Sequence, residues 1–326
     1  MARAPYRVAL VGCGGIGYAF GRARKNGLGG GALSHFQAFS EHPAFRVVGV
    51  ADPNPAARRE ITDEHGLPAF AEAGELLAAC PADVVVIAAP DHTHPSLLRQ
   101  IAPFRPRAVL CEKPLAQSLA EAETLAKQYE DAGIALCVNY SRRFLPGYAA
   151  LRELLASGGL GRLQSLLIYY SRGFRHNASH YLDLLLWWFG EPESVIVDGH
   201  RPGLSPDDPC LSLTLAYPDG LEVRLVALED GALRINEMDI IGSTGRLRLD
   251  TLGELTRFAL AEHPDYPGLQ IFAPAERRSL DLNQALPAAA EALRLWLEGA
   301  GALPSTAQDS LALHRLMDRI TQKDTQ

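Results

Sequence analysis

The sequence predicts an α/β Rossmann domain with a parallel sheet, followed by an α+β domain with an open antiparallel sheet. A glycine-rich turn directly follows the first apolar run, and apolar runs then alternate with helical patterns. Further along the chain, strands follow one another through short turns. The length of 326 residues suits two domains. We expect them at 1–138 and 139–326, with a C-terminal helix able to pack back on the first domain.

Composition excludes several classes of protein. With 47% hydrophobic and 21% charged residues, the chain can bury a substantial core. A net charge of −7 argues against a nucleic-acid partner, because phosphate binding needs concentrated Lys and Arg. The cysteines are scattered without a C-x-x-C pair, which argues against disulfides and a zinc site. Neither a membrane-spanning run nor an apolar signal segment is apparent. We therefore expect a cytoplasmic protein with no membrane partner and no metal.

The glycine-rich turn indicates a dinucleotide site. The apolar run Val8–Val11 is typical of a buried parallel strand. In a dinucleotide fold, Gly12 would allow the tight turn, Gly14 the close approach of a pyrophosphate, and Gly17 the close packing of the next helix. A glycine-rich turn in another kind of α/β domain remains the alternative. The expected cofactor-binding residues of this turn are Gly12, Gly14, Gly15, Ile16 and Gly17.

The second strand, Phe45–Ala51, ends in Asp52. In a dinucleotide fold this carboxylate binds the adenosine ribose, and it favours NAD because it would repel the 2′-phosphate of NADP. Arg58 and Arg59 follow closely and keep NADP open as the alternative. Asp-Pro-Asn-Pro is also good turn chemistry in its own right, so Asp52 has a competing structural role.

An insertion separates the glycine turn from this acid. Gly17 and Asp52 lie 35 residues apart, against a usual spacing of about 20 residues. The excess falls in Tyr18–Gly31, a basic and then glycine-rich stretch. We expect either a flap over the cofactor or substrate entrance or a solvent loop.

Further βα units follow. Asp83–Ala89, Ala108–Cys111 and Ile134–Val138 are apolar, β-branched runs that predict buried strands, with helices from about 95 and over about 118–132. Ligands of parallel sheets bind at the carboxyl ends of the strands. His94 either caps the helix that starts at Pro95 or lines the cofactor pocket. At this edge we expect as further cofactor-binding residues Ala89, Pro90, His94, Glu112 and Lys113.

Lys113 is the first catalytic candidate. It follows a buried strand and precedes Pro114, which disfavours a helical conformation at the lysine. An ammonium at this edge can hydrogen-bond a substrate oxygen and stabilise alkoxide character during hydride transfer. The alternative is an ordinary surface lysine.

His180 is the second catalytic candidate. His176, His180, Asp183 and Trp187 have the spacing of one helical face, and Asp183 could orient a histidine that accepts a hydroxyl proton. Two alternatives remain: a His-x-x-x-His metal site, for which no third ligand is evident, and a buried structural histidine.

The pattern changes after Tyr140. Helices are expected at about 145–157 and 178–189 around a strand at 163–172, and strands then follow in succession. Tyr217–Leu221 and Gly242–Gly245 are hairpin turn signals. The expected later elements are strands 194–198, 210–217, 221–227, 234–241, 247–249 and 255–260, and helices 287–298 and 306–321.

Five segments together resemble the successive motifs of the glucose–fructose oxidoreductase / inositol dehydrogenase / rhizopine-catabolism (Gfo/Idh/MocA) family: VGCGGIG, AAPDHTHP, CEKPLA, NYSRRF and HNASHYLDLLLWWFG. The resemblance covers residues 5 to about 190. It implies NAD(P)-dependent oxidation or reduction of a carbinol carbon of sugars, cyclitols or nucleotide-linked sugars. It also implies that Lys113 is the E-K-P lysine, that His180 is the acid/base, and that the C-terminal sheet joins a homodimer or homotetramer.

One departure from the family pattern concerns the substrate. Many sugar and inositol dehydrogenases of this family carry Asp where this chain has His176. The charge pattern around the substrate should therefore differ, and inositol becomes a poor guess. A carboxylated or phosphorylated sugar would suit the nearby arginines. The expected substrate-binding residues are Arg143, Arg172, His176, Asn177 and Asp183.

The sequence thus predicts an NAD-dependent oxidoreductase acting on a secondary alcohol of a sugar, uronic acid or nucleotide-sugar derivative. One alternative is a redox-neutral hydrolase or epimerase that uses transient oxidation by bound NAD. Another is a non-catalytic dinucleotide-sensing regulator, which would have no need for Lys113 and His180 together.

Overall fold

The computed structural model describes residues 4–22, 31–229, 231 and 234–324. The chain forms two compact units, Met1–Phe144 with Asn283–Leu311, and Leu145–Leu282 with Ala312–Gln326. This division differs from the expected one at residue 138, because 139–144 and 283–311 cluster with the first unit. Of the predicted insertion Tyr18–Gly31, residues 23–30 lie outside the described residues.

The first unit is built on a parallel sheet with the strand order β3-β2-β1-β4-β5-β6. This confirms the predicted Rossmann domain. The short outer strand was not expected from the sequence. The strands are β1 (Tyr6–Val11), β2 (Phe45–Ala51), β3 (Ala69–Phe70), β4 (Val84–Ile87), β5 (Ala108–Cys111) and β6 (Ala135–Val138).

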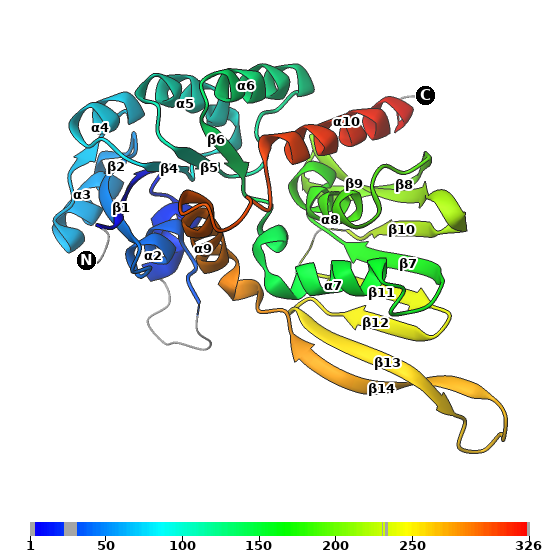
Figure 1. Ribbon diagram of the computed structural model, residues 1–326. Helices are drawn as coiled ribbons and strands as arrows, with labels where there is room; N and C mark the ends of the chain where they lie inside the picture. The colour runs from blue at the N-terminus through cyan, green and yellow to red at the C-terminus, as the bar shows by residue number, and fades with distance from the viewer. Residues whose placement is uncertain (1–3, 23–30, 230, 232–233, 325–326) are drawn as a thin grey trace. The chain divides into compact units, whose positions relative to one another are not determined.

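Helices cover both sides of this sheet. Figure 1 shows α4, α5 and α6 along one side and α2 and α9 along the other. Polar side chains fix several helix starts: the Ser34 and Asn54 oxygens accept hydrogen bonds from the first-turn N–H groups of Gln37 and Ala56. The helices are α1 (Phe20–Arg22), α2 (His35–Ser40), α3 (Pro55–His65), α4 (Ala73–Ala79), α5 (His94–Ile101), α6 (Leu119–Asp131) and α9 (Ala285–Leu297).

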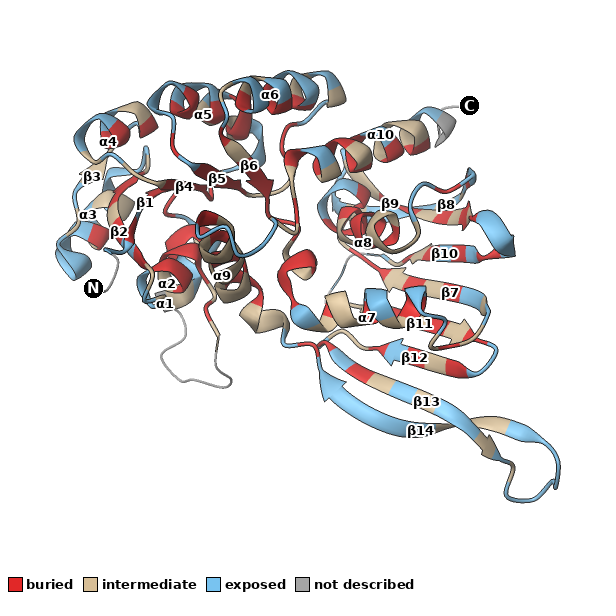
Figure 2. Ribbon diagram, in the orientation of Figure 1, coloured by how far each residue is buried: buried red, intermediate tan, exposed pale blue. Residues whose placement is uncertain are grey.

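The core of the first unit lies between sheet and helices. Every residue of β4 and β5 is buried, as expected for central parallel strands covered on both faces (Figure 2). From α9, Ala289, Leu293 and Leu297 belong to the same apolar cluster as Val8 and Leu10 of β1. This packing explains why α9 clusters with the first unit although it follows the second in sequence.

The second unit contains an eight-stranded sheet with the order β14-β13-β12-β11-β7-β10-β9-β8. The sheet is mostly antiparallel, as predicted, and one pair of neighbours, β7 and β10, is parallel. The turns at 217–221 and 242–245 join antiparallel neighbours, as predicted. The last strand was missed. The strands are β7 (Leu163–Tyr170), β8 (Ser194–Ser205), β9 (Asp208–Ala216), β10 (Glu222–Ala227), β11 (Asn236–Gly242), β12 (Gly245–Leu249), β13 (Glu254–Glu262) and β14 (Gln270–Ser279).

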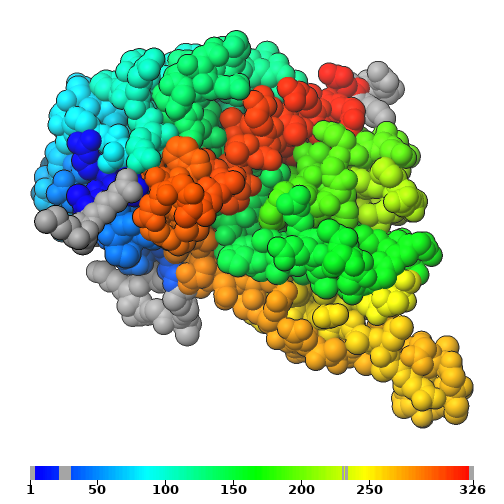
Figure 3. Space-filling view, viewed as in Figure 1, coloured from blue at the N-terminus to red at the C-terminus, as the bar shows by residue number. Residues whose placement is uncertain are grey.

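One face of this sheet is buried and the other is open. In β7, Leu166, Ile168 and Tyr170 are buried, whereas the alternate residues Leu167 and Tyr169 are only partly buried. Figure 1 shows α7 (Pro146–Ala156) and α8 (Ser179–Phe189) against the sheet. The hairpin of β13 and β14 is largely exposed and extends beyond the rest of this unit (Figures 2 and 3).

The chain ends in α10 (Ala307–Asp324), which begins in the first unit and continues into the second. Among the described residues, no helix combines the length and apolar character needed to cross a bilayer.

Candidate functional site

The strand ends of the first unit lie in register. Val11 pairs with both Ala51 and Ile87, and Ile87 pairs with Cys111. Backbone hydrogen bonds continue past these ends, from Gly12 N to Ala51 O at 2.8 Å and from Ala88 N to Val11 O at 2.7 Å. The residues that follow the strands therefore share one edge of the sheet: Gly12, Asp52, Ala88, Glu112 and Asn139.

The glycine turn is closed toward the protein and open on one side. Gly12 has a φ of +96°, and a Cβ there would lie 2.5 Å from Ala88 O. A Cβ on Gly17 would lie 2.1 Å from Gly12 O, so both positions require glycine. At Gly14 an added Cβ would meet nothing within 4 Å. The turn therefore leaves space at Gly14 for a pyrophosphate, and it fits the cofactor that the sequence predicts.

The chain beyond this turn forms a π-helical turn at Gly15–Ala19, which leads into α1. Tyr18 N and Ala19 N both donate to Gly14 O, and Ile16 is 37% exposed. Gly15 and Ile16 thus lie beside the open position, where the sequence placed them.

Asp52 ties the glycine turn to the end of β2. Its Oδ2 accepts a hydrogen bond from Cys13 N at 2.7 Å, and its Oδ1 accepts one from Asn54 N at 2.8 Å. A carboxylate has about four lone-pair sites, so acceptor capacity remains for ribose hydroxyls. The two roles considered for Asp52 are therefore compatible.

Beside Asp52, the Cys13 thiol is protonated and the Arg58 guanidinium is hydrogen-bonded to backbone oxygens. Burial, together with the Asp52 carboxylate, raises the pKa of the Cys13 thiol to about 12, so this thiol is no nucleophile at neutral pH. Arg58 Nη1 donates to the backbone oxygens of Asp52 at 2.7 Å and Pro53 at 2.9 Å. Arg59 is exposed on α3.

Glu112 is held inside the protein. Its Oε1 lies 2.8 Å from His35 Nε2 and accepts a hydrogen bond from Asn139 Nδ2 at 2.7 Å, while its Oε2 accepts one from Lys113 N at 3.3 Å. Burial by itself would raise the pKa of Glu112, but the hydrogen bonds from His35 and Asn139 and the charges of His35 and Lys113 outweigh it, and the pKa is lowered. The carboxylate thus anchors the segment that contains Lys113, and the cofactor-binding role of Glu112 stays a prediction.

His94 also stabilises the segment that contains Lys113. Its ring is fully buried, with Nδ1 2.7 Å from Pro114 O and Nε2 3.0 Å from Ala89 O. It therefore joins the loops after β4 and β5 and neither caps α5 nor lines a pocket, which corrects both expectations. Ala89 is partly exposed and Pro90 exposed. Lys113 is partly exposed and lies between Glu112 and Pro114, both of which are hydrogen-bonded to the rest of the unit.

In the second unit a hydrogen-bonded turn precedes α8. The carboxylate of Asp208 accepts hydrogen bonds from Arg175 N at 2.7 Å and His176 N at 2.9 Å. The Asn177 amide donates to Ser171 O at 2.7 Å. His176 lies in the π-turn Phe174–Ala178, which leads directly into α8, and the buried Asn177 stabilises this turn through its amide. Their substrate-binding roles stay predictions.

The remaining candidates of this unit are on or beside α8. His180 is its second residue and is partly exposed, whereas Asp183 is buried. In the described part of the chain, no group of three or more His, Cys, Asp or Glu side chains is placed to hold a metal ion. The metal alternative for His176 and His180 therefore lacks its ligand set there.

The two predicted substrate arginines differ. The Arg143 side chain is 4% exposed, and its Nη1 lies 2.8 Å from Asp309 Oδ1, so a substrate-binding role is corrected to a structural ion pair. Arg172 is partly exposed with a φ of +75°. Within the described residues its guanidinium makes neither a hydrogen bond nor an ion pair. Of these two arginines, Arg172 is therefore the one whose guanidinium can bind an anionic group of the substrate.

Sequence reasoning missed the partners that hold the candidates in place. His35, Asp208 and Asp309 are such residues, and Asn236 is another, since its Oδ1 accepts a hydrogen bond from Asn177 Nδ2 at 2.6 Å. Each partner is remote in sequence from the residue that it binds, and for most of them no local motif indicates the contact. The one available signal is at Asp208, which lies in the turn-forming stretch Ser-Pro-Asp-Asp-Pro.

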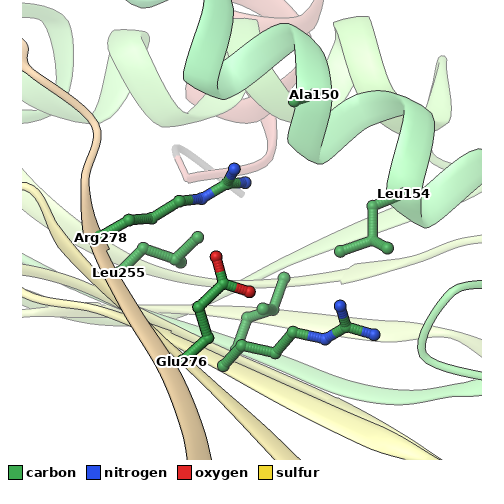
Figure 4. Close-up of a pocket in the computed structure, with 7 residues that line it drawn as sticks. Ala150, Leu154, Leu255, Glu276 and Arg278 are labelled. Atoms are coloured by element: carbon green, nitrogen blue, oxygen red, sulfur yellow. The ribbon is translucent and has the colours of Figure 1, made fainter.

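A separate hollow of about 210 Å³ lies in the second unit between α7 and the strands β12 to β14. Figure 4 shows Glu276 and Arg278 of β14 in this hollow, with Ala150 and Leu154 on the helix above it. It contains none of the residues that the sequence marks for catalysis or binding.

Comparisons with known proteins indicate the kind of domain that the first unit forms. Residues 6–140 match the family model GFO_IDH_MocA, "Oxidoreductase family, NAD-binding Rossmann fold". The rhizopine catabolism protein MocA of Rhizobium meliloti is 32% identical over 158 residues, 48% of this chain and 44% of the relative. An inositol 2-dehydrogenase of Rhizobium meliloti is 30% identical over 185 residues, 52% of this chain and 56% of the relative. The chain thus spans about half the length of these curated relatives.

A solved structure matches over both units. The WlbA dehydrogenase of Bordetella pertussis, in complex with NADH and UDP-GlcNAcA, has a TM-score of 0.76 at 21% identity, covering 99% of this chain and 96% of that one. At this identity the match shows the fold. Residues 6–140 are thus similar to the NAD-binding domain of Gfo/Idh/MocA oxidoreductases, and over both units the chain shares the fold of the WlbA dehydrogenase.

Proposed function

We propose that this protein is an NAD-dependent oxidoreductase that transfers a hydride to or from a secondary alcohol carbon of a sugar, uronic acid or nucleotide-sugar derivative. The observation that carries the proposal is the register of the strand ends in the first unit. It brings the open glycine turn, the Asp52 carboxylate and the anchored Lys113 to one edge of the sheet.

The cofactor contacts follow from this edge. The open side of the turn at Gly14 takes the pyrophosphate, and Asp52 accepts hydrogen bonds from the adenosine ribose. The negative charge of Asp52 selects NAD over NADP. A bound nicotinamide supplies the hydride acceptor or donor.

Lys113 and His180 stabilise the substrate oxygen and transfer its proton. In the oxidation direction, the Lys113 ammonium donates a hydrogen bond to the substrate oxygen and stabilises its developing negative charge. His180 accepts the hydroxyl proton as general base. As the hydride leaves carbon, the carbonyl forms, and one proton remains on the protein. In the reverse direction His180 returns the proton.

An anionic substituent on the substrate suits Arg172, whose guanidinium is unpaired among the described residues. The relatives support a polyol or sugar substrate: one is an inositol 2-dehydrogenase, and WlbA was solved with UDP-GlcNAcA. Because His176 replaces the acid that many inositol dehydrogenases carry, a carboxylated sugar is the better expectation.

We also infer that copies of the chain associate through the open face of the sheet in the second unit. That face mixes apolar residues such as Ile196, 58% exposed, with cross-strand ion pairs such as Arg224–Asp198 at 3.2 Å. Light scattering of the purified protein tests this: a dimer or tetramer supports it, and a monomer contradicts it.

The test of the activity is net NADH formation from NAD with a panel of neutral sugars, uronic acids and nucleotide sugars. Turnover with equimolar NADH and ketone product supports the proposal. Product formation without net NADH would instead indicate the redox-neutral hydrolase or epimerase. Tight NAD binding without any turnover would indicate a dinucleotide sensor.

A further inference from the structure

Asp208 acts as a helix cap supplied from a remote strand. It begins β9 and lies 33 residues from Arg175, yet its two carboxylate oxygens accept the Arg175 and His176 backbone N–H groups at 2.7 and 2.9 Å. These N–H groups belong to the first residues of the π-turn before α8, where donors have no partner within the helix. Hydrogen bonds to an ionised carboxylate are stronger than those between neutral groups.

The surrounding backbone leaves room for this carboxylate. A Cβ on Gly173 would lie 2.2 Å from Asp208 Oδ2, and a Cβ on Gly203 would lie 1.9 Å from Asp208 O. Gly173 also has a φ of +101°, which side-chain-bearing residues rarely adopt. Asp208 and the turn therefore fit together only because both neighbouring positions lack side chains.

Just before this turn, Arg172 has an unfavourable backbone conformation. Arg172 has a φ of +75° although it carries a side chain, so surrounding contacts must hold it. Besides Asp208, two contacts do so: Gly173 N donates to Cys210 Sγ at 2.9 Å, and Asn177 Nδ2 donates to Ser171 O at 2.7 Å. Such conformations cluster at functional sites.

We propose that Asp208 is a positioning residue for the catalytic helix of the second unit. By fixing the turn Phe174–Ala178, it sets where α8 begins and so where His180, the second residue of α8, is presented. It also keeps Arg172 in its left-handed conformation. Both Asp208 oxygens accept hydrogen bonds from backbone N–H groups of the turn, so the role assigned to it acts through His180 and Arg172. This inference rests on the proposed function, which gives His180 its proton-transfer role.

The test compares Asp208→Asn with Asp207→Asn. The neighbouring Asp207 is exposed and, among the described residues, its side chain makes no hydrogen bond or ion pair, so it gives a matched control for the same change of charge. Asn at 208 keeps one acceptor but removes the charge and the second acceptor. Hydrogen exchange of peptides covering 171–180 measures how stably the turn is formed. Steady-state kinetics measure whether His180 is correctly placed. NADH affinity measures whether the first unit is unaffected by the substitution.

In Asp208→Asn we expect exchange at 174–178 to be at least about 10-fold faster and kcat to fall on the order of 10- to 100-fold, as for a misplaced catalytic group. The KM for NAD should stay unchanged, and the limb of the pH profile that reports the general base should move. Asp207→Asn should match the wild type in all of these. Wild-type kcat in Asp208→Asn, or a lower kcat with unchanged exchange, would overturn the proposal.

A second variant guards against misfolding of the first. Asn236→Ala removes the acceptor of the Asn177 amide, which lies 2.6 Å away, and loosens the same turn from another strand. It should reproduce the loss of kcat with unchanged NADH binding, and a wild-type kcat would count against the proposal. If the wild-type protein oxidises no substrate, the proposed function fails, and the exchange result alone then decides whether Asp208 holds the turn.

Discussion

His35 of α2 and Glu112 at the end of β5 share a buried hydrogen bond of 2.8 Å between Nε2 and Oε1. They are 77 residues apart in sequence, and the carboxylate also binds the Asn139 amide. Because Glu112 precedes Lys113, this pair fixes the backbone from which the proposed catalytic ammonium projects.

The Glu112 carboxylate should make stability depend on pH. Its folded-state pKa is lowered, so its contribution is complete above the unfolded pKa and is lost as the pH falls through the folded pKa. We expect the free energy of unfolding of the wild type to fall on acidification from about pH 5 to about pH 3, and less steeply in Glu112→Gln. Urea unfolding at both pH values measures this.

Glu121→Gln is the control for that change. It breaks an exposed pair with Arg99, and such pairs contribute less than about 1 kcal/mol. A Glu112→Gln protein with the wild-type dependence on pH would show that the buried pair contributes nothing.

Two glycine substitutions should separate folding from cofactor binding. Gly14→Ala adds a methyl group to open space at a φ of −71°, so we expect a wild-type melting temperature with NAD affinity reduced on the order of 10-fold or more. Gly17→Ala would place a Cβ 2.1 Å from Gly12 O and should destabilise the first unit itself.

Calorimetric NAD titration and thermal melting check both glycine variants. Gly74→Ala on α4, where the added methyl group also meets nothing within 4 Å, should leave NAD affinity unchanged. Full NAD affinity in Gly14→Ala would contradict the placement of the pyrophosphate.

Asp52 should set the preference for the dinucleotide. In Asp52→Asn the amide oxygen still accepts one hydrogen bond, but the charge that repels a 2′-phosphate is gone. We expect the ratio of kcat/KM for NAD to that for NADP to fall about 10-fold or more, as for a lost charge-assisted hydrogen bond. The exposed Asp63→Asn on α3 serves as control, and an unchanged ratio in Asp52→Asn would refute the ribose role.

The two arginines should give opposite phenotypes. Arg143→Ala leaves Asp309 without its buried partner and should cost roughly 3 kcal/mol of stability. Arg172→Ala should melt like the wild type but raise the KM for an anionic substrate about 10-fold or more, since a hydrogen bond to a charged group is lost. Equal KM values for the wild type and Arg172→Ala would rule out anion recognition by this side chain.

The sequence predicted the sheet edge well because its signals are local. An apolar run that ends in glycine, Asp52 or Glu112 marks a parallel strand and its carboxyl end within a few residues. The hairpin turns of the second unit are local signals of the same kind. The last strand, β14, was missed because it is largely exposed and polar and contains Pro274, which weakens a strand pattern.

The polar anchors could not be predicted from one sequence. Arg143 and Asp309 are 166 residues apart, and Asp208 and Arg175 are 33 apart, so no local pattern pairs them. Composition and spacing identified Arg143 and Asn177 as polar groups near the site. Only the fold shows that their hydrogen bonds are made within the protein. The parallel pairing of β7 with β10 is non-local in the same way.

The measurement that tests the central claim most directly is NADH formation by the wild type and by Lys113→Ala on the best substrate of the panel. Lys127→Ala, an exposed lysine paired with Asp131 on α6, is the control. We expect Lys113→Ala to bind NADH normally while its kcat falls on the order of 10²-fold or more, with Lys127→Ala unchanged. Near wild-type turnover in Lys113→Ala would contradict the account.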